Sequence, residues 1–206
     1  DSIANGTHEI APGEPRPMAL FSAERTDYSL ARLKHYTGTA PEHVQSFVLL
    51  TNYQRYVDRF IEYAMAQVGR DGYETLVQPG DVVTGPDGIP SAPLPPQLPQ
   101  MPAYHLTRAD GQGITMINIG VGPSNAKTIT DHLAVLRPHC WLMVGHCAGL
   151  RRSQQLGDYV LAHAYVRDDK VLDDDLPLWV PIPPLAEIQV ALEAAVAEIS
   201  QLEGYG

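Results

Sequence analysis

The segment ITMINIGVGPSNA at residues 114–126 constrains the fold of this chain more than any other. It begins as an apolar, β-branched run, continues into a glycine turn and ends in residues that favour a helix. Strand, glycine turn and helix in this order direct backbone N–H groups and the positive end of a helix dipole toward one point. The segment therefore predicts an anion-binding turn around Gly120, Gly122 and Ser124, with phosphate as its natural ligand. The alternative is that Ser124 only caps the helix and that the glycines only relieve crowding.

A second strand with a similar ending follows at residues 141–150, which read WLMVGHCAGL. Two neighbouring strands that each end in glycine predict a pocket. His146 is interpreted as a hydrogen-bond donor in this pocket, and Cys147 as a packed thiol. We expect no metal, because the pairs His139–Cys140 and His146–Cys147 open and close one extended strand and point far apart.

Two well-known phosphate-binding patterns do not fit the glycine turn. A dinucleotide turn would read G-x-G-x-x-G, but its third glycine position holds Asn125, and the next strand ends in Gly145 instead of an acidic residue. A Walker-type loop fails because Lys127 is not preceded by glycine at the required place. What remains is a generic anion turn, in which Ser124 caps the helix, and no cofactor is predicted.

Composition narrows the function further. The chain has 206 residues, enough for one domain with a substantial core. Its formal net charge is -10 and its pI is near 5.1, which argues against general nucleic-acid binding, because such binding needs clustered Lys and Arg. No apolar run approaches the roughly 18 residues that span a bilayer, and nothing at the N-terminus reads as a signal peptide. Two cysteines do not make a disulfide framework, so we expect a cytoplasmic domain.

Hydrophobic periodicity and turn residues divide the chain into alternating strands and helices. Residues 1–20 are expected to form an extended arm. Proline recurs so often between residues 79 and 102 that we expect a surface excursion without helix or strand ladder. The other predicted elements are strands at 47–51, 103–107, 114–119, 141–145 and 159–166, and helices at 26–36, 53–68, 124–136 and 184–202. This alternation indicates an α/β fold with a central, largely parallel sheet.

Arg25 and Arg55 are candidates for binding an anionic ligand. Each lies in a cluster of polar and aromatic residues, ERTDYS at 24–29 and TNYQRY at 51–56. These surroundings suit ligand binding better than solubility alone, although most arginines of this kind are solvated surface groups. Asn52 and Tyr53 belong to the second cluster and are candidate substrate-binding residues with it.

Several long segments resemble the AMP nucleosidases, a family of the nucleoside phosphorylase superfamily. The resemblance covers nearly all of the chain after the first twenty or so residues and is weakest in the proline-rich segment. The matching stretches are RTDYSLARLKHYTGT (25–39), TNYQRYVDRF (51–60), ADGQGITMINIGVGPSNAKTITDHLAVLRP (109–138), GHCAGL (145–150) and GDYVLAHAYVRDDKVLDDDLP (157–177). It implies that residues 21–206 are the N-terminal part of a catalytic domain, a three-layer α/β/α sandwich of the nucleoside phosphorylase type that assembles as a hexamer.

The resemblance also implies an activity, the hydrolysis of AMP to adenine and ribose 5-phosphate. By analogy, Gly122, Ser124 and Asn125 would lie at the phosphate and ribose end of the site. Arg25 would fall near the arginine that binds phosphate in the phosphorylases. Arg55 would be offered across a subunit boundary.

The base would be bound by the second glycine turn. Cys147, Ala148 and Gly149 correspond to a Ser-Cys-Gly turn that passes beside the base in the phosphorylases. The strand before that turn usually carries an arginine for the phosphate nucleophile, but here Met143 lies near that place. Because a thioether does not hold a phosphate dianion, water is the expected nucleophile, and cleavage would pass through a ribosyl cation-like state.

The same resemblance leaves the catalytic residue unassigned. In the family, a Met-Glu ribose-binding turn and a catalytic aspartate come after the point that corresponds to Gly206. The sequence therefore leaves two further possibilities open: a non-catalytic nucleotide-binding or assembly module, and a purine nucleoside phosphorylase, against which the missing strand arginine argues.

Overall fold

The computed structural model describes residues 2, 7–14, 26–166 and 177–200. These residues fall into two compact units, residues 1–145 and residues 146–206. Within the expected N-terminal arm, residues 7–14 are exposed and contain neither helix nor strand, and most of its other residues lie outside the described part.

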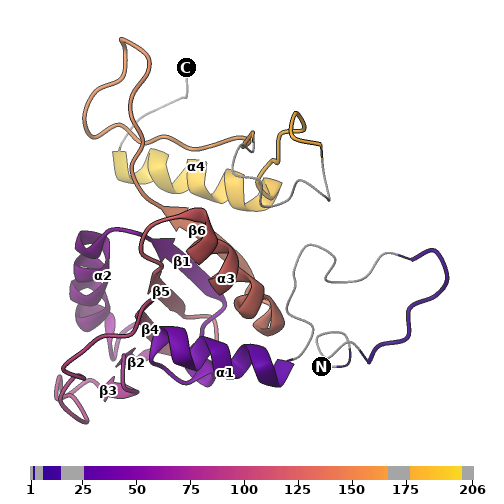
Figure 1. The fold of residues 1–206 in the computed structure, drawn as a ribbon. Coiled ribbons are helices and arrows are strands. Elements are labelled where there is room, and N and C mark those ends of the chain that lie inside the picture. The colour runs from indigo at the N-terminus through magenta and orange to yellow at the C-terminus, as the bar shows by residue number, and fades with distance from the viewer. Residues whose placement is uncertain (1, 3–6, 15–25, 167–176, 201–206) are drawn as a thin grey trace. The chain divides into compact units, whose positions relative to one another are not determined.

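The first unit is built on one six-stranded sheet with the order β3-β2-β4-β5-β1-β6 (Figure 1). The pairings of β1 with β5 and with β6 are parallel, and the other three pairings are antiparallel. The sheet is mixed and less parallel than the sequence indicated, because short hairpins join β2 to β3 and β4 to β5. The strands are β1 Phe47–Thr51, β2 Tyr73–Gln78, β3 Val82–Thr84, β4 Ala103–Arg108, β5 Ile114–Asn118 and β6 Cys140–Val144.

Helices cover both faces of this sheet, which confirms the three-layer arrangement (Figure 1). Helices α1 (Thr26–Thr37) and α3 (Pro123–Leu133) pack together on one face, and α2 (Gln54–Gln67) covers the other. Short 3₁₀ helices η1 (Pro41–His43) and η2 (Ala134–Leu136) follow α1 and α3. Each face has its own core, centred on Leu33, Leu50, Ile117, Ile129 and Leu133 under α1 and α3, and on Val57, Phe60, Leu76, Tyr104 and Met116 under α2.

The proline-rich segment contains one strand that the sequence did not predict. β3 lies inside residues 79–102 and pairs with β2, where Val82 and Thr84 are buried. β2 itself was also missed. The prediction of no ladder was therefore wrong for residues 82–84, because proline first recurs at Pro86 and leaves this short stretch free to pair. From Pro86 to Gln100 the chain is largely exposed and follows the predicted excursion.

Three prolines fasten this excursion to the rest of the first unit. Each one lies against a glycine of positive φ: Pro86 on Gly69, Pro95 on Gly80 and Pro99 on Gly38. A side-chain carbon on any of these glycines would approach the proline ring to 3.2 Å or less. Two properties of glycine favour it at these positions: it adopts positive φ readily, and it has no Cβ to press on the proline ring.

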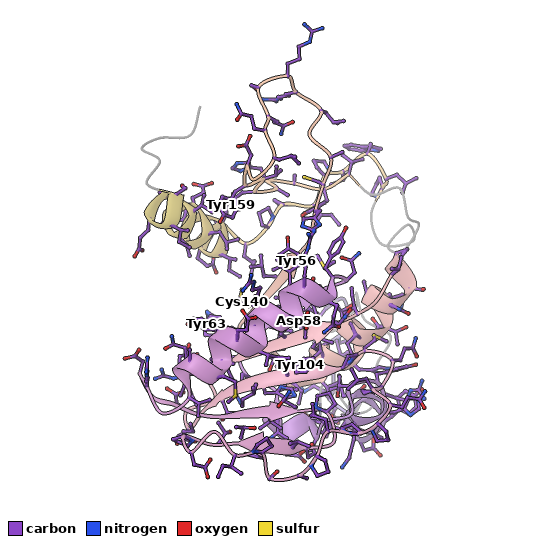
Figure 2. The ribbon with its side chains drawn as sticks, turned by 90° about the vertical axis from the view of Figure 1, so that its left-hand side faces the viewer. Tyr56, Asp58, Tyr63, Tyr104, Cys140 and Tyr159 are labelled. Carbon is purple, nitrogen blue, oxygen red and sulfur yellow. The ribbon has the colours of Figure 1, made fainter. Side chains whose placement is uncertain are left out.

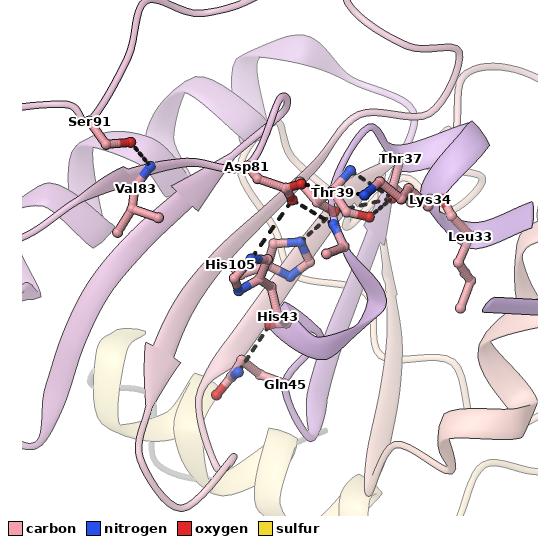
Figure 3. Close-up of polar contacts among 11 residues, drawn as sticks. Leu33, Lys34, Thr37, Thr39, His43, Gln45, Asp81, Val83, Ser91 and His105 are labelled. Carbon is pink, nitrogen blue, oxygen red and sulfur yellow. Dashed lines mark hydrogen bonds and ion pairs between the residues drawn. The ribbon is translucent and has the colours of Figure 1, made fainter. Parts of the chain in front are cut away.

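A buried histidine joins β4 to the sequence around α1 and β5 (Figure 3). His105 is fully buried, and its two ring nitrogens lie 2.8 Å from Thr39 Oγ1 and 2.9 Å from Thr115 Oγ1. The Thr115 hydroxyl accepts the backbone N–H of Gln45, so it can donate its own proton to Nδ1. Burial, followed by the nearby His43, lowers the pKa of His105 from 6.5 to about 3. The imidazole is therefore neutral at physiological pH.

In the described residues of the second unit, the helix is α4 (Ala186–Ser200), close to the predicted range 184–202. The strand expected at 159–166 was wrong: this stretch forms no ladder in the described part, and Tyr165 makes a single bridge with Ile182. Apolar side chains in this stretch are not packed into a core, since Tyr159, Val160 and Val166 are more than half exposed. Without a neighbouring strand among the described residues to pair with, the β-favouring residues do not form a strand. In the described part of the chain, no helix is both long enough and apolar enough to cross a membrane.

Candidate functional site

Three parallel strands of the first unit end together at one edge of the sheet. Thr51 at the end of β1 is in register with Asn118 of β5 on one side and with Val144 of β6 on the other. The backbone N–H of Ile119 donates to the Thr51 carbonyl over 2.8 Å, which extends the β1–β5 pairing by one residue. Residues that follow these three strands are therefore neighbours, although they lie far apart in the sequence.

The connections that leave this edge go to opposite faces of the sheet. After β1 the chain enters α2, whereas after β5 it enters α3 on the other face. Adjacent parallel strands whose helices diverge in this way form a topological switch point, the usual ligand-binding position in open α/β sheets. We call the ends of β1 and β5 with the following turns the switch point.

The predicted glycine turn lies at the switch point. Gly120 has φ of 65° and Gly122 has φ of 107° with ψ of 154°, a combination that is open essentially to glycine alone. Asn118 Oδ1 accepts the N–H of Gly120 over 3.1 Å, and Asn125 Nδ2 donates to the Ile119 carbonyl over 2.9 Å. Side chains on both sides of the turn thus hold its backbone in place.

Ser124 does not cap the helix, in contrast to the expectation from the sequence. Pro123 occupies the first helical position and Gly122 is the N-cap residue, with no side-chain cap hydrogen bond. Proline is favoured there because its missing N–H would have no helical partner and its φ suits a helix. Ser124 is exposed just inside the helix, so its hydroxyl and the amides of Ser124 and Asn125 belong to the helix end that attracts anions.

The TNYQRY cluster approaches the same place from β1. Asn118 Nδ2 donates to Gln54 Oε1 over 3.2 Å and ties the end of β5 to the start of α2. Asn52 and Tyr53 border Gly145 at the end of β6, since a methyl group on Gly145 would lie 3.9 Å from Asn52 Oδ1 and 4.0 Å from Tyr53 Cε2. The sequence did not reveal the contribution of Asn118 and Gln54, which meet only because β1 and β5 are neighbours.

Arg55 supplies positive charge in the first turn of α2. Its guanidinium is exposed and lies 5.4 Å from the ring centre of Tyr53 and 5.7 Å from that of Tyr56. Stacking on two tyrosine faces limits the orientations of the arginine side chain without neutralising it. An anion at the switch point would find a directed cation beside it.

Burial keeps the side chains of Tyr104 and Cys140, both in the first unit, in their neutral forms. Figure 2 shows α2 in front of the sheet, with Asp58 on the helix and Tyr104 on the sheet behind it. Burial, and then the Asp58 carboxylate, raise the pKa of the Tyr104 phenol. Burial also raises the pKa of the Cys140 thiol. Both groups stay neutral at physiological pH, which suits packing more than acid–base chemistry.

The remaining predicted site residues lie elsewhere. His146, Cys147, Ala148 and Gly149 belong to the second unit, where all four are exposed. The interpretation of Cys147 as a packed thiol was therefore wrong, because the turn that carries it is not covered by other elements. Arg25 lies outside the described residues. Among the residues that are described, no group of three or more His, Cys, Asp or Glu side chains could hold a metal ion.

Comparison with known proteins gives this site a context. No family model matches the chain. The chain is 54% identical over 210 residues to AMP nucleosidase of Escherichia coli K12, and the match covers 99% of this chain and 43% of that protein. Over this length the chain is similar to the AMP nucleosidases. AMP nucleosidase of E. coli O157:H7 matches to the same extent, so the chain spans less than half the length of these relatives.

Solved structures extend the relationship to the fold. The AMP nucleosidase of Bacteroides thetaiotaomicron superposes with a TM-score of 0.62 at 26% identity, over 84% of this chain and 60% of that one. Two phosphorylases share the same architecture. Purine nucleoside phosphorylase of Toxoplasma gondii superposes with a TM-score of 0.56 at 16% identity, over 80% of this chain and 58% of that one. Uridine phosphorylase of Vibrio fischeri superposes with a TM-score of 0.56 at 15% identity, over 86% of this chain and 61% of that one. Like AMP nucleosidase, the chain has a nucleoside phosphorylase-type fold.

Proposed function

We propose that this chain is part of an AMP-cleaving hydrolase, in which the switch point binds the nucleotide. The glycine turn at Gly120–Asn125 carries the proposal, because it offers amide donors and a helix N-terminus at the position where open α/β sheets bind ligands. Similarity to the AMP nucleosidases supports AMP as the nucleotide.

In the proposed reaction, the bond between C1′ of the ribose and N9 of adenine breaks. Water supplies a hydroxyl group to C1′ and a proton to N9, so the products are ribose 5-phosphate and adenine. Gly122, Ser124 and Asn125 bind the 5′-phosphate, and Arg55 adds a positive charge beside it. We assign no catalytic residue and no cofactor.

Other parts of the proposal rest on the family relationship. Arg25 contributes to phosphate binding, Asn52 and Tyr53 contact the nucleotide, and His146 with Cys147–Gly149 forms the side of the site that faces the base. The protein is placed in the cytoplasm and assembles as a hexamer, and Arg55 serves the site of its own subunit. Free phosphate competes with AMP for the turn.

The proposal is tested by incubating the purified protein that contains this chain with AMP, with and without phosphate, and separating the products by chromatography. We expect adenine and ribose 5-phosphate in equal amounts, formed without phosphate. Cleavage that requires phosphate would instead identify a purine nucleoside phosphorylase. AMP binding without release of adenine would identify a non-catalytic nucleotide-binding or assembly module, and absence of binding would rule out the proposed site.

Gly122→Ala should impair the phosphate-binding turn selectively. A methyl group at Gly122 meets only open space, 4.0 Å from Ser124 Oγ, so the penalty is backbone strain of about 1–3 kcal/mol at φ of 107°. Relief of that strain moves the amides away from the phosphate. We expect AMP affinity to fall about 10-fold or more by isothermal titration calorimetry.

Gly88→Ala is the matched control for that variant. Gly88 also has positive φ, 70°, with no atom near its missing Cβ, but it lies in the exposed proline-rich segment. Its stability should fall by about 1 kcal/mol while AMP affinity stays at the wild-type value. Equal affinity losses in the two variants would mean that the Gly122 turn is not the binding site.

Arg55→Gln should weaken AMP binding through loss of charge. The control is Arg59→Gln, one helical turn further on, where the exposed arginine pairs with Glu62 at 2.6 Å. We expect a loss of affinity of about 10-fold for Arg55→Gln, which fades in high salt, and little change for Arg59→Gln. A similar response of both variants would indicate a general effect of net charge.

A further inference from the structure

One amide group at the switch point differs from its neighbours. The Oδ1 atom of Asn52 is buried, and among the described residues it has no hydrogen-bond partner. The amides of Gln54, Asn118 and Asn125, all close to the same edge, each have one. Buried polar atoms are paired in more than nine cases out of ten, so an unpaired acceptor at a ligand-binding position calls for a donor from outside the protein.

A glycine lies beside this oxygen. A methyl group on Gly145 would have Asn52 Oδ1 and the Tyr53 ring as its nearest atoms, at 3.9 and 4.0 Å. These are ordinary contact distances, so alanine would fit without strain but would occupy the space in front of the amide. A methyl group at Gly145 would therefore compete with a ligand atom for the surroundings of the amide.

The chemistry of a carbonyl oxygen restricts that atom. An amide oxygen only accepts hydrogen bonds, and the oxygens of an ionised phosphate do the same, so Asn52 Oδ1 and phosphate repel each other. In AMP, the groups that can donate are the ribose hydroxyls and the amino group of adenine. Asn52 and the phosphate-binding turn follow adjacent strands, about 4.8 Å apart, and the ribose is the part of AMP joined directly to the phosphate.

We propose that Asn52 Oδ1 accepts a hydrogen bond from a ribose hydroxyl and so makes the site specific for ribonucleotides. The proposal rests on AMP binding at the switch point. Recognition of this kind discriminates strongly, because a deoxyribose ligand leaves the buried oxygen unpaired. The same oxygen is a cost to the ligand-free protein, since it is buried without a partner.

The test compares AMP, 2′-deoxy-AMP and 3′-deoxy-AMP by calorimetry on the wild-type chain and on Asn52→Leu. In the wild type, one of the two deoxy ligands should bind about 5- to 100-fold more weakly than AMP. In Asn52→Leu, AMP and both deoxy ligands should bind equally. If Asn52→Leu keeps the wild-type preference for the hydroxyl, or if the wild type has none, the assignment is wrong.

Two further measurements separate recognition from a structural role. Asn52→Leu should melt at or above the wild-type temperature, because it removes an unpaired buried acceptor; a clear loss of stability would mean that Asn52 has a partner in the protein. Gly145→Ala should keep the wild-type melting temperature but bind AMP at least 5-fold more weakly. If the wild-type chain binds no AMP at all, the proposed function fails together with this assignment, whereas unselective AMP binding overturns the assignment alone.

Discussion

Gly113→Ala should destabilise the first unit by about 3–5 kcal/mol, the largest effect that we expect from a single methyl group. Gly113 is buried just before β5, and a Cβ there would overlap the carbonyl oxygen of Leu106 and lie 2.6 Å from Gln45 Oε1. Gln45 Oε1 already accepts hydrogen bonds from the backbone N–H groups of Arg108 and Gly113, at 3.1 and 3.2 Å. Neither the strand nor the side chain has room to retreat without losing these hydrogen bonds.

Urea unfolding followed by tryptophan fluorescence measures this effect. Trp141 packs against the core under α1 and α3, whereas Trp179 is 80% exposed in the second unit, so a Trp179→Phe background restricts the signal to the first unit. Gly85→Ala is the matched control, because its φ is not positive and its Cβ would meet only Asp87 Oδ1 at 3.7 Å. A loss below 1 kcal/mol for Gly113→Ala would show that the β4–β5 hairpin adjusts easily.

Acid should destabilise the first unit through His105. The unfolded chain binds a proton at this residue near pH 6.5, but the folded chain does so only near pH 3. Between these values the unfolded state holds more protons, so the free energy of unfolding falls with falling pH by up to about 1.4 kcal/mol per unit. Above pH 6.5 the residue contributes no pH dependence. From pH 7 to pH 5 the expected loss is about 2 kcal/mol.

His105→Gln isolates this contribution from those of other groups, such as His132, whose pKa is also lowered by burial. Glutamine is neutral and can still donate to Thr39 and accept from Thr115, so the variant should fold, with a loss of about 1–3 kcal/mol at pH 7. Its unfolding free energy should fall about 2 kcal/mol less than that of the wild type between pH 7 and pH 5. Parallel pH curves for the two proteins would mean that His105 does not resist protonation.

Local sequence patterns predicted most of the first unit. The helices at α1, α2 and α3 and the strands at β1, β4, β5 and β6 follow from apolar runs and apolar periodicity. The three helices and the strands β1, β4 and β5 contribute buried residues to the two cores, whereas the residues of β6 are half-buried or exposed. β3 was missed because it is three residues long and borders the prolines. The strand predicted at 159–166 failed for the opposite reason: alternation of side chains describes a strand only where a partner strand accepts its hydrogen bonds.

Of the candidate site, only the glycine turn could be predicted from the sequence. The glycines of 120–122 mark positions that need positive φ, and such positions are visible in a sequence. The partners that hold the turn are not, since Asn118 and Gln54 are 64 residues apart and meet through strand order. The helix cap at Ser124 was predicted wrongly because Pro123 shifts the start of α3 by one residue. The unpaired oxygen of Asn52 depends on three strands at once and has no signature in the sequence.

The three proline rings seated on Gly38, Gly69 and Gly80 fix how the exposed segment responds to its surroundings. Contacts between carbon atoms carry no charge and exchange no proton, so ionic strength and acidity leave them unchanged. The residues between Pro95 and Pro99 can therefore vary in length and composition, whereas a side chain at any of the three glycines would press on its proline ring and require a backbone conformation that favours glycine. An inserted peptide or epitope tag between Pro95 and Pro99 would be displayed on a loop whose two ends stay attached.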